Sequence, residues 1–463
     1  MTQKGSRESV NSHASEEDEH AELFSAVLST VNKEQLALLG STVLRRIEPQ
    51  HPTAQTTPSI GDPMYGSFHV LFPLLFETSL RWLVKIPING TPEKWNDSSA
   101  SALASEASTM RMLKRETTIP LPDVLDFSST TQNALQCPYI VMTFISGIPL
   151  YDAWFGHHLS GASPELTRER RTRALDNIAA AMMQLGRFTF PSGGRPTFGE
   201  DGEISEIGPV RRIDRRAMLD RWFIHNDPDD DPIYVECPAY TDPKRHYNFM
   251  LDMYPEENLV PRGMQALLRK LISWIPEPDE AASFVLTHPD FDIQNFIVSN
   301  DGELQAIIDW DGVAAMPRTL GNERYPGWLT RDWDPNMYGY KESMDQGVKP
   351  EGLWEDSPTS LSFYRSLYEK MLAKYRVGES QSSDNDICRM SLITDNIAIA
   401  TEDPTCRAEM LQKIVEEIGA ISEHAAELDF DDLVVMFAEN NVDDAVMDML
   451  QKGFIGLLSK EGL

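Results

Sequence analysis

The stretch of sequence that decides the fold runs from Leu286 to Val313 and reads LTHPDFDIQNFIVSNDGELQAIIDWDGV. Two apolar, strand-like runs in it are flanked by closely spaced polar side chains, which are His288, Asp290, Asp292, Asn295, Asp309 and Asp311. An ionised carboxylate beside buried chain is costly unless a partner compensates its charge. A metal ion, a catalytic proton transfer or a hydrogen-bonded turn would each provide that compensation.

The composition indicates a globular and strongly acidic protein. The 463 residues, of which 41% are hydrophobic, suffice for two or three compact units with a sizeable core. The net charge of −31 opposes binding of nucleic acid, or of an anionic membrane, through a basic surface. A cationic small substrate would suit this charge, and solvated surface carboxylates are the alternative explanation.

Cysteines, apolar runs and the first residues predict the cellular context. The four cysteines are scattered without a C-x-x-C pair or metal-ligand spacing, which predicts reduced, structural thiols. No apolar run approaches the roughly 18 residues of a membrane span, so no membrane insertion is expected. Residues 1–20 read MTQKGSRESVNSHASEEDEH, lack an apolar signal core and are too acidic for a mitochondrial presequence. We therefore expect a cytoplasmic protein.

Periodicity and breaks in composition predict a small strand-rich lobe followed by a larger helical lobe. A long helix is expected after Ser163, a suitable cap, with Pro164 in its first turn. Residues 189–260 are rich in Pro, Asp and Gly and predict an irregular insertion. The expected segments are a disordered acidic tail (1–20), a short helical lead (21–55), an N-lobe (56–148), a C-lobe with catalytic and metal loops (149–378) and a helical C-terminal extension (379–463).

In the small lobe, a lysine and a glutamate are candidates for a buried ion pair. Lys85 lies in the strand-like run RWLVKIP, and Glu106 lies on a helix expected near 98–115. Glu106 comes three residues after Leu103 and four before Met110, so it shares their apolar stripe and needs a cationic partner. Such a pair can hold an ammonium where phosphate oxygens bind. The alternative for Lys85 is an edge or snorkelling residue.

A strand turn precedes Lys85 in the segment YGSFHV, residues 65–70. Gly66 and Ser67 are expected at this turn, where backbone N–H groups can face an anion. The segment contains one glycine, so by itself it is a weak signal for phosphate binding.

The spacing H-x-D-x-x-x-x-N, from His288 to Asn295, is the more specific pattern. Phosphoryl transfer needs a carboxylate that orients the nucleophile, oxygen ligands for magnesium and cations on the phosphates. Asp290 is predicted to take the hydroxyl proton or to hold the hydroxyl in line. Asn295 and Asp309 are predicted to offer oxygen ligands to Mg²⁺. A turn at Asn-Asp-Gly, residues 300–302, would return Asp309 beside Asn295.

Three neighbouring residues have alternative interpretations. His288 is expected mainly to hydrogen bond to the backbone. Asp292 is either a second metal ligand or a turn-former, and Asp311 is either a further ligand or a loop cap. A transition-metal site of His and Asp would need another ligand that the spacing does not indicate.

With Lys85, Glu106, Asp290, Asn295 and Asp309 in this order, the chain resembles the aminoglycoside phosphotransferase and choline kinase branch of the protein-kinase-like fold. HPDFDIQN is similar to that family's H-G-D-x-x-x-x-N loop, with proline where glycine is usual, and IIDWDG is similar to its I-I-D-W-E segment. PRTLGNERYPGWLTRDWDP is similar to fungal phosphotransferase-domain proteins, some of them grouped with a mitochondrial-inheritance factor. The resemblance covers roughly residues 55–375.

The resemblance implies an α+β fold of two lobes, a small antiparallel sheet with one main helix and a larger, mostly helical lobe. ATP and magnesium would bind between the lobes, and the γ-phosphate would pass to a hydroxyl of a small molecule. Thr143 and Ile145, in the hinge-like segment YIVMTFISGIPL, would meet the adenine. The alternative is a kinase-like module that binds nucleotide or partners with weak or no turnover, which the glycine-poor loop favours. The acceptor and the oligomeric state stay open.

Overall fold

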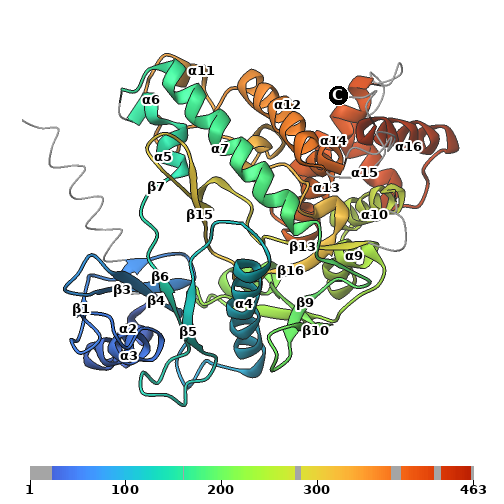
Figure 1. Ribbon diagram of the computed structural model, residues 1–463. Helices are drawn as coiled ribbons and strands as arrows, with labels where there is room; N and C mark the ends of the chain where they lie inside the picture. Colours follow the sequence, from blue (N-terminus) through green and yellow to red (C-terminus); the bar gives the residue numbers. More distant parts are fainter. Residues whose placement is uncertain (1–22, 160, 277–282, 377–386, 422–428, 460–463) are drawn as a thin grey trace, which may run out of the picture.

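The computed structural model describes residues 23–159, 161–276, 283–376, 387–421 and 429–459 (Figure 1). In these ranges the chain forms a small sheet-based N-lobe and a larger, mostly helical C-lobe, as the resemblance implied. The acidic tail expected at residues 1–20 lies outside the described residues.

The N-lobe is built on a six-stranded sheet whose main path runs β1-β3-β4-β6-β5, with β2 paired to β3. All of these pairings are antiparallel. The strands are β1 (Ser59–Ile60), β2 (Met64–Tyr65), β3 (His69–Leu75), β4 (Arg81–Pro87), β5 (Val124–Ser128) and β6 (Tyr139–Thr143). The helices are α2 (Ser25–Thr30), α3 (Lys33–Ile47) and α4 (Asp97–Glu116).

Strand β4 directs Lys85 into the molecule because side chains alternate between the two faces of a sheet. Trp82, Val84 and Ile86 are buried on the face that packs with α2 and α3. Lys85 points to the opposite face, where α4 lies and where its ammonium meets Glu106. The helix expected near 98–115 is therefore confirmed, with Glu106 on its buried side.

The C-lobe contains the helices and short strands from residue 148 onward. Its helices up to residue 375 are α5 (Leu150–Trp154), α6 (Gly156–Leu159), α7 (Pro164–Leu185), α8 (Arg215–Leu219), α9 (Pro243–Met253), α10 (Leu259–Trp274), α11 (Glu342–Asp345) and α12 (Pro358–Tyr375). Its strands are β7 (Ile148–Pro149), β8 (Thr189–Phe190), β9 (Arg195–Phe198), β10 (Ile204–Gly208), β11 (Val210–Ile213), β12 (Tyr234–Cys237), β13 (Phe284–Thr287), β14 (Phe296–Val298), β15 (Leu304–Ile307) and β16 (Ala314–Pro317). Ser163 caps α7 by accepting a hydrogen bond from Leu166 N, as expected.

The hairpin β14–β15 has the predicted strand–turn–strand form. Phe296 pairs with Ile307, and Ser299 N donates to Glu303 O across the turn. Gly302 adopts φ +86°, and a Cβ there would lie 2.5 Å from Arg170 O, so the turn requires glycine.

The expectation of an irregular insertion at residues 189–260 is wrong. The segment forms the antiparallel hairpin β9–β10, then an antiparallel pair of strands, β11 and β12, with α8 between them, and then α9. The strands span four or five residues each, and prolines, aspartates and glycines of the intervening turns dominate the composition. The first hairpin lies against α4, so the insertion braces the main helix of the N-lobe (Figure 1).

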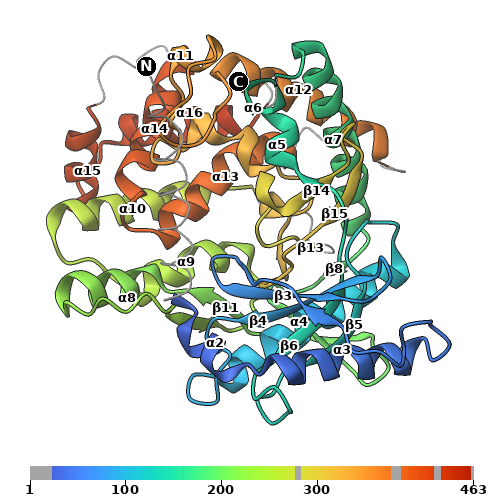
Figure 2. The same ribbon diagram turned by 90° about the vertical axis from the view of Figure 1, so that its left-hand side faces the viewer.

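The C-terminal helices belong to the core of the C-lobe. They are α13 (Ile387–Glu402), α14 (Arg407–Ile421), α15 (Phe430–Ala438) and α16 (Asp444–Leu458), and their helical character is as predicted. Ile393, Ile414 and Phe454 are buried in one cluster with Leu175 of α7 and Leu268 of α10. Figure 2 shows α13 and α14 beside α10. Among the described residues, no helix is both long and apolar enough to cross a membrane.

Candidate active site

A buried lysine connects the two lobes. Lys85 Nζ lies 2.7 Å from Glu106 Oε1 and 2.8 Å from Asp309 Oδ1. Burial acts to lower the pKa of Lys85, but the carboxylates of Asp309 and Glu106 outweigh it and raise the pKa above its ordinary value. The ammonium therefore stays charged and is held where strand β4, helix α4 and the loop after β15 meet.

Asp309 follows strand β15 in a backbone conformation that is unusual outside glycine, with φ +59°. Ile308 N donates to Asn295 O at 2.9 Å, so the hairpin sets Asp309 beside the end of the catalytic loop, as expected. Burial acts to raise the pKa of Asp309, but Lys85 and His69 outweigh it and lower the pKa below its ordinary range. The side chain is still 48% exposed, which leaves the carboxylate accessible to a ligand.

The loop after β13 presents Asp290 through hydrogen bonds from its own neighbours. Gln294 Nε2 and Asn295 Nδ2 both donate to Asp290 Oδ2 at 2.8 Å. Asn295 Nδ2 also donates to the backbone oxygen of Asp290, at 2.8 Å. Both amide protons of Asn295 are therefore directed at Asp290, which turns the Asn295 amide oxygen away from that carboxylate.

His288 and Asp292 support this loop. Burial lowers the pKa of His288 to about 4, so the ring is neutral near pH 7, and its Nε2–H donates to Ile308 O at 2.9 Å. The backbone-bonding role expected for His288 is confirmed. Asp292 Oδ1 accepts from Ile293 N at 2.7 Å, and its other oxygen pairs with Arg331. The turn-forming alternative for Asp292 is thus the one observed.

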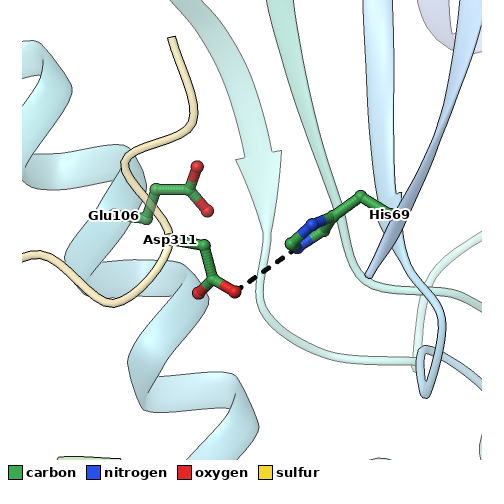
Figure 3. Close-up of side chains that lie close together, drawn as sticks. All are labelled: His69, Glu106 and Asp311. Carbon is green, nitrogen blue, oxygen red and sulfur yellow. Dashed lines mark ion pairs between the residues drawn. The ribbon is translucent and has the colours of Figure 1, made fainter. Parts of the chain in front are cut away.

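Asp311 lies in a cluster with His69 and Glu106, which come from different elements (Figure 3). Asp311 projects from the loop after β15, Glu106 from α4 and His69 from the start of β3. His69 Nε2 lies 3.6 Å from Asp311 Oδ2, and Arg211 Nη2 lies 3.7 Å from Asp311 Oδ1. These contacts tie Asp311 to the N-lobe and to the insertion, a role that neither expected alternative described.

Some of the backbone N–H groups predicted to contact the nucleotide form hydrogen bonds within the protein. Gly66 N donates to His69 O at 2.9 Å, so it closes the turn and is not available to an anion, while Ser67 is exposed. Thr143 N donates to Asp123 O at 3.1 Å. In this conformation the N–H groups of Gly66 and Thr143 are therefore committed within the protein, and contacts of these residues with a nucleotide stay predictions. Within the described residues, the backbone of Ile145 makes no such bond.

Two side-chain oxygens at the hairpin are suitable ligands for a magnesium ion. Asn295 donates through its nitrogen, and in the described part of the chain its Oδ1 accepts no hydrogen bond. Asp309 accepts a hydrogen bond from Lys85 through Oδ1, so its Oδ2 can bind a metal ion. Both spare atoms are hard oxygens, the ligand type that Mg²⁺ prefers.

A cleft beside Asp290 was not found from the sequence, because its walls come from remote segments. It has a volume of about 410 Å³. Its lining includes Asp290 and Phe291 of the catalytic loop, Arg324, and Asp395 and Ile399 of α13. Arg211 of the insertion was also missed, since no sequence signal distinguishes it from the neighbouring arginine.

Comparison with known proteins identifies the family of the chain. Residues 75–319, more than half of the chain, match the model of the phosphotransferase enzyme family. The matched span contains Lys85, Glu106, Asp290, Asn295 and Asp309. The chain belongs to this phosphotransferase family.

Individual relatives are distant. A subtelomeric hrmA-associated cluster protein of Aspergillus fumigatus is 21% identical over 328 residues, 59% of this chain and 61% of that protein. Altered inheritance of mitochondria protein 9, mitochondrial, of Candida dubliniensis is 28% identical over 204 residues, 44% of this chain and 30% of that protein. The chain thus matches less than two thirds of the length of either relative.

Similar solved structures include aminoglycoside phosphotransferase APH(4)-Ia in a ternary complex with AMP-PNP and hygromycin B. It is 14% identical, covers 87% of this chain and 98% of its own, and has a TM-score of 0.39. An ethanolamine kinase of Plasmodium vivax is 11% identical, covers 90% of this chain and 91% of its own, and has a TM-score of 0.37. The family assignment rests on the family model.

Proposed function

We propose that this protein is an ATP- and magnesium-dependent phosphotransferase that moves the γ-phosphate to a hydroxyl of a small molecule. The observation that carries the proposal is the contact of Lys85 with both Glu106 and Asp309. It holds an ammonium, whose pKa the two carboxylates raise, beside a carboxylate whose second oxygen is available, at the boundary of the two lobes. Phosphoryl transfer depends on such positioned charges more than on covalent chemistry of the protein.

Each residue of the site has a defined task in this proposal. Lys85 steadies phosphate oxygens, and Glu106 holds its ammonium in place. Asp290 holds the acceptor hydroxyl in line and receives its proton. Asn295 and Asp309 would hold the magnesium ion, which neutralises charge on the transferring phosphate when it is bound.

The cleft beside Asp290 is the proposed acceptor site. A volume of about 410 Å³ suits a small molecule. Asp395, in its wall, faces Arg324 at 3.7 Å, and burial raises the pKa of the Asp395 carboxyl to about 6. Polar and charged side chains therefore meet the acceptor near the catalytic loop, which favours a hydroxyl-bearing polar compound.

The cytoplasmic location expected from the sequence stays a prediction.

One observation favours a second candidate, a module that binds ligand without turnover. The cavity that Lys85 and Glu106 line beside Phe68 and His69 has a volume of about 10 Å³, no more than a water molecule occupies. A triphosphate does not fit in this cavity, so the turn at Gly66 and Ser67 would have to open before a triphosphate could enter it. If that opening is rare, the protein turns over slowly or not at all.

The Asp290→Ala variant separates the two candidates. We expect magnesium-dependent consumption of ATP by the wild-type protein to fall by about 10²–10⁴-fold in Asp290→Ala, while binding of AMP-PNP persists. Asp301→Ala, in the exposed turn of the same hairpin, is the matched control and should retain activity. Wild-type protein that binds AMP-PNP but consumes no ATP with a broad panel of alcohols and amino sugars would favour the binding module instead.

A further inference from the structure

The antiparallel strand pair β11–β12 of the insertion brings an arginine to the cavity that Lys85 and Glu106 line. Arg211 pairs with Glu236 in the register of the two strands, and its guanidinium lies 4.0 Å from the centre of the Tyr234 ring. Arg211 Nη1 donates to Ser99 Oγ at 2.9 Å, at the start of α4. The aromatic face and the hydroxyl thus fix the guanidinium before any ligand arrives.

Arg211 shares its surroundings with Lys85. The cavity that contains Lys85 and Glu106 is also lined by Arg211. A neighbouring cavity of about 160 Å³ is lined by Arg211, Arg195, Phe68 and Asp311. Phe68 follows the turn of Gly66 and Ser67, so this second cavity lies under the loop that is expected to cover phosphates.

The guanidinium of Arg211 retains donors for a ligand. Among the described residues it makes one hydrogen bond, to Ser99, and its approach to Asp311 at 3.7 Å is longer than a hydrogen bond. Its side chain is 11% exposed, so it is partly desolvated and opens on the cavity. A planar guanidinium suits two oxygens of one phosphate group.

The cluster of His69, Glu106 and Asp311 in Figure 3 does not favour a metal ion at this place. Lys85 Nζ already contacts Glu106, and Arg211 lies beside Asp311. The ammonium of Lys85 and the guanidinium of Arg211 already compensate the carboxylates of Glu106 and Asp311, so these carboxylates have less negative charge to offer a divalent cation. Lys85 and Arg211 are the two groups at this place that suit phosphate oxygens.

We propose that Arg211 is a second phosphate-binding residue of the nucleotide site, supplied by the insertion and acting beside Lys85 on the triphosphate. This inference rests on the proposed function, since it assumes a nucleotide in the cleft. It also gives a physical role to this strand pair: the Gly66 N–H is bonded to His69 O within its own turn, and Arg211 provides charged donors in its place.

A purely structural role is the competing explanation, because the insertion also braces α4. Ser98 Oγ donates to Glu236 Oε1 at 2.6 Å, next to the Arg211 contact but outside both cavities. Ser98→Ala removes this brace and leaves the cleft intact. It is the matched control for Arg211→Gln, since a loss that comes only from a displaced α4 would appear in both variants.

The test is calorimetric titration of the full chain with AMP-PNP in magnesium, and with adenosine as a phosphate-free ligand. We expect Arg211→Gln to weaken the affinity for AMP-PNP by at least about tenfold and to keep the affinity for adenosine within about twofold of wild type. The Ser98→Ala variant should bind both ligands within about twofold of wild type. Arg211→Lys keeps the positive charge but lacks the planar guanidinium, so its affinity for AMP-PNP should lie between those of wild type and Arg211→Gln.

The outcomes are distinguishable. If wild-type protein binds no AMP-PNP, the proposed function fails, and this inference fails with it. If wild type binds and Arg211→Gln binds equally well, the inference alone is overturned. Equal losses for AMP-PNP and adenosine, or equal losses in Ser98→Ala, would assign Arg211 to bracing and overturn it as well. If Arg211→Gln does not fold, a wild-type affinity of Arg211→Lys for AMP-PNP would overturn the inference.

Discussion

Lys85 Nζ lies 2.8 Å from Asp309 Oδ1, although 224 positions separate the two residues in the chain. Strand β4 carries the lysine and the loop after β15 carries the aspartate, so this contact joins the lobes at the candidate site. Glu106 lies on the other side of the same ammonium, at 2.7 Å. The lysine is thereby positioned by one residue of each lobe, and the predictions below begin from this contact.

Removing the ammonium should destabilise the protein and abolish nucleotide binding. Glu106 is 3% exposed, and Lys85→Met removes its cation; loss of one partner of a buried pair costs about 3–5 kcal/mol. We expect the Lys85→Met/Glu106→Gln double variant to regain much of that stability, because the uncompensated charge is gone, but not to bind AMP-PNP. Urea unfolding and calorimetry measure the two properties. A double variant less stable than Lys85→Met would contradict this account.

Asp309→Asn should raise the magnesium requirement. The substitution removes a carboxylate ligand but keeps a residue type that tolerates the φ of +59° found there. We expect the magnesium concentration for half-maximal ATP consumption to rise by at least about tenfold. Asp301→Asn, in the turn of the same hairpin, should leave it unchanged. An unchanged requirement in Asp309→Asn would show that the metal lies elsewhere.

Acidification should destabilise the fold through His246. The residue is 3% exposed, and Arg212 directs a donor at its Nε2, which requires an unprotonated nitrogen there. Burial and, secondarily, Arg212 lower the pKa of His246 well below its ordinary value of 6.5. Below pH 6.5 the unfolded chain therefore binds a proton that the folded protein does not, and stability falls as pH falls.

The expected slope is about 1.4 kcal/mol of unfolding free energy per pH unit for this one residue. Chemical denaturation of wild type and His246→Gln between pH 7 and pH 5 measures it, and His246→Gln should show the shallower slope by about that amount. His225→Gln, at an exposed histidine, should keep the wild-type slope. Identical slopes in wild type and His246→Gln would refute the assignment.

Gly263→Ala should loosen the attachment of the C-terminal helices. A Cβ at Gly263 of α10 would lie 2.0 Å from Val434 O of α15, so the two helices would have to separate. Overpacking of this kind costs about 1–3 kcal/mol. Gly352→Ala is the control, because a Cβ there meets nothing within 4 Å. Hydrogen exchange that stays unchanged in α15 of Gly263→Ala would argue against the close contact.

Local patterns predicted most of the elements and the pairing of site residues. The cap at Ser163, the apolar stripe that carries Glu106 and the positive φ of Gly302 in its turn are local features of the chain, so they can be predicted directly. The apolar alternation around Lys85 likewise indicates which way its side chain points. The insertion was misjudged because its strands are short and its turns dominate the composition.

The sequence by itself determined which side chains share a helix face, a strand face or a hairpin, because those relationships follow from the helical and strand repeats and from turn chemistry. Tertiary structure alone decided that Arg211 lines the same cavity as Lys85, that Asp309 contacts Lys85 and that α13 lines the proposed acceptor cleft. Such contacts join residues far apart in the chain, and they depend on how whole elements pack, which a local repeat does not encode.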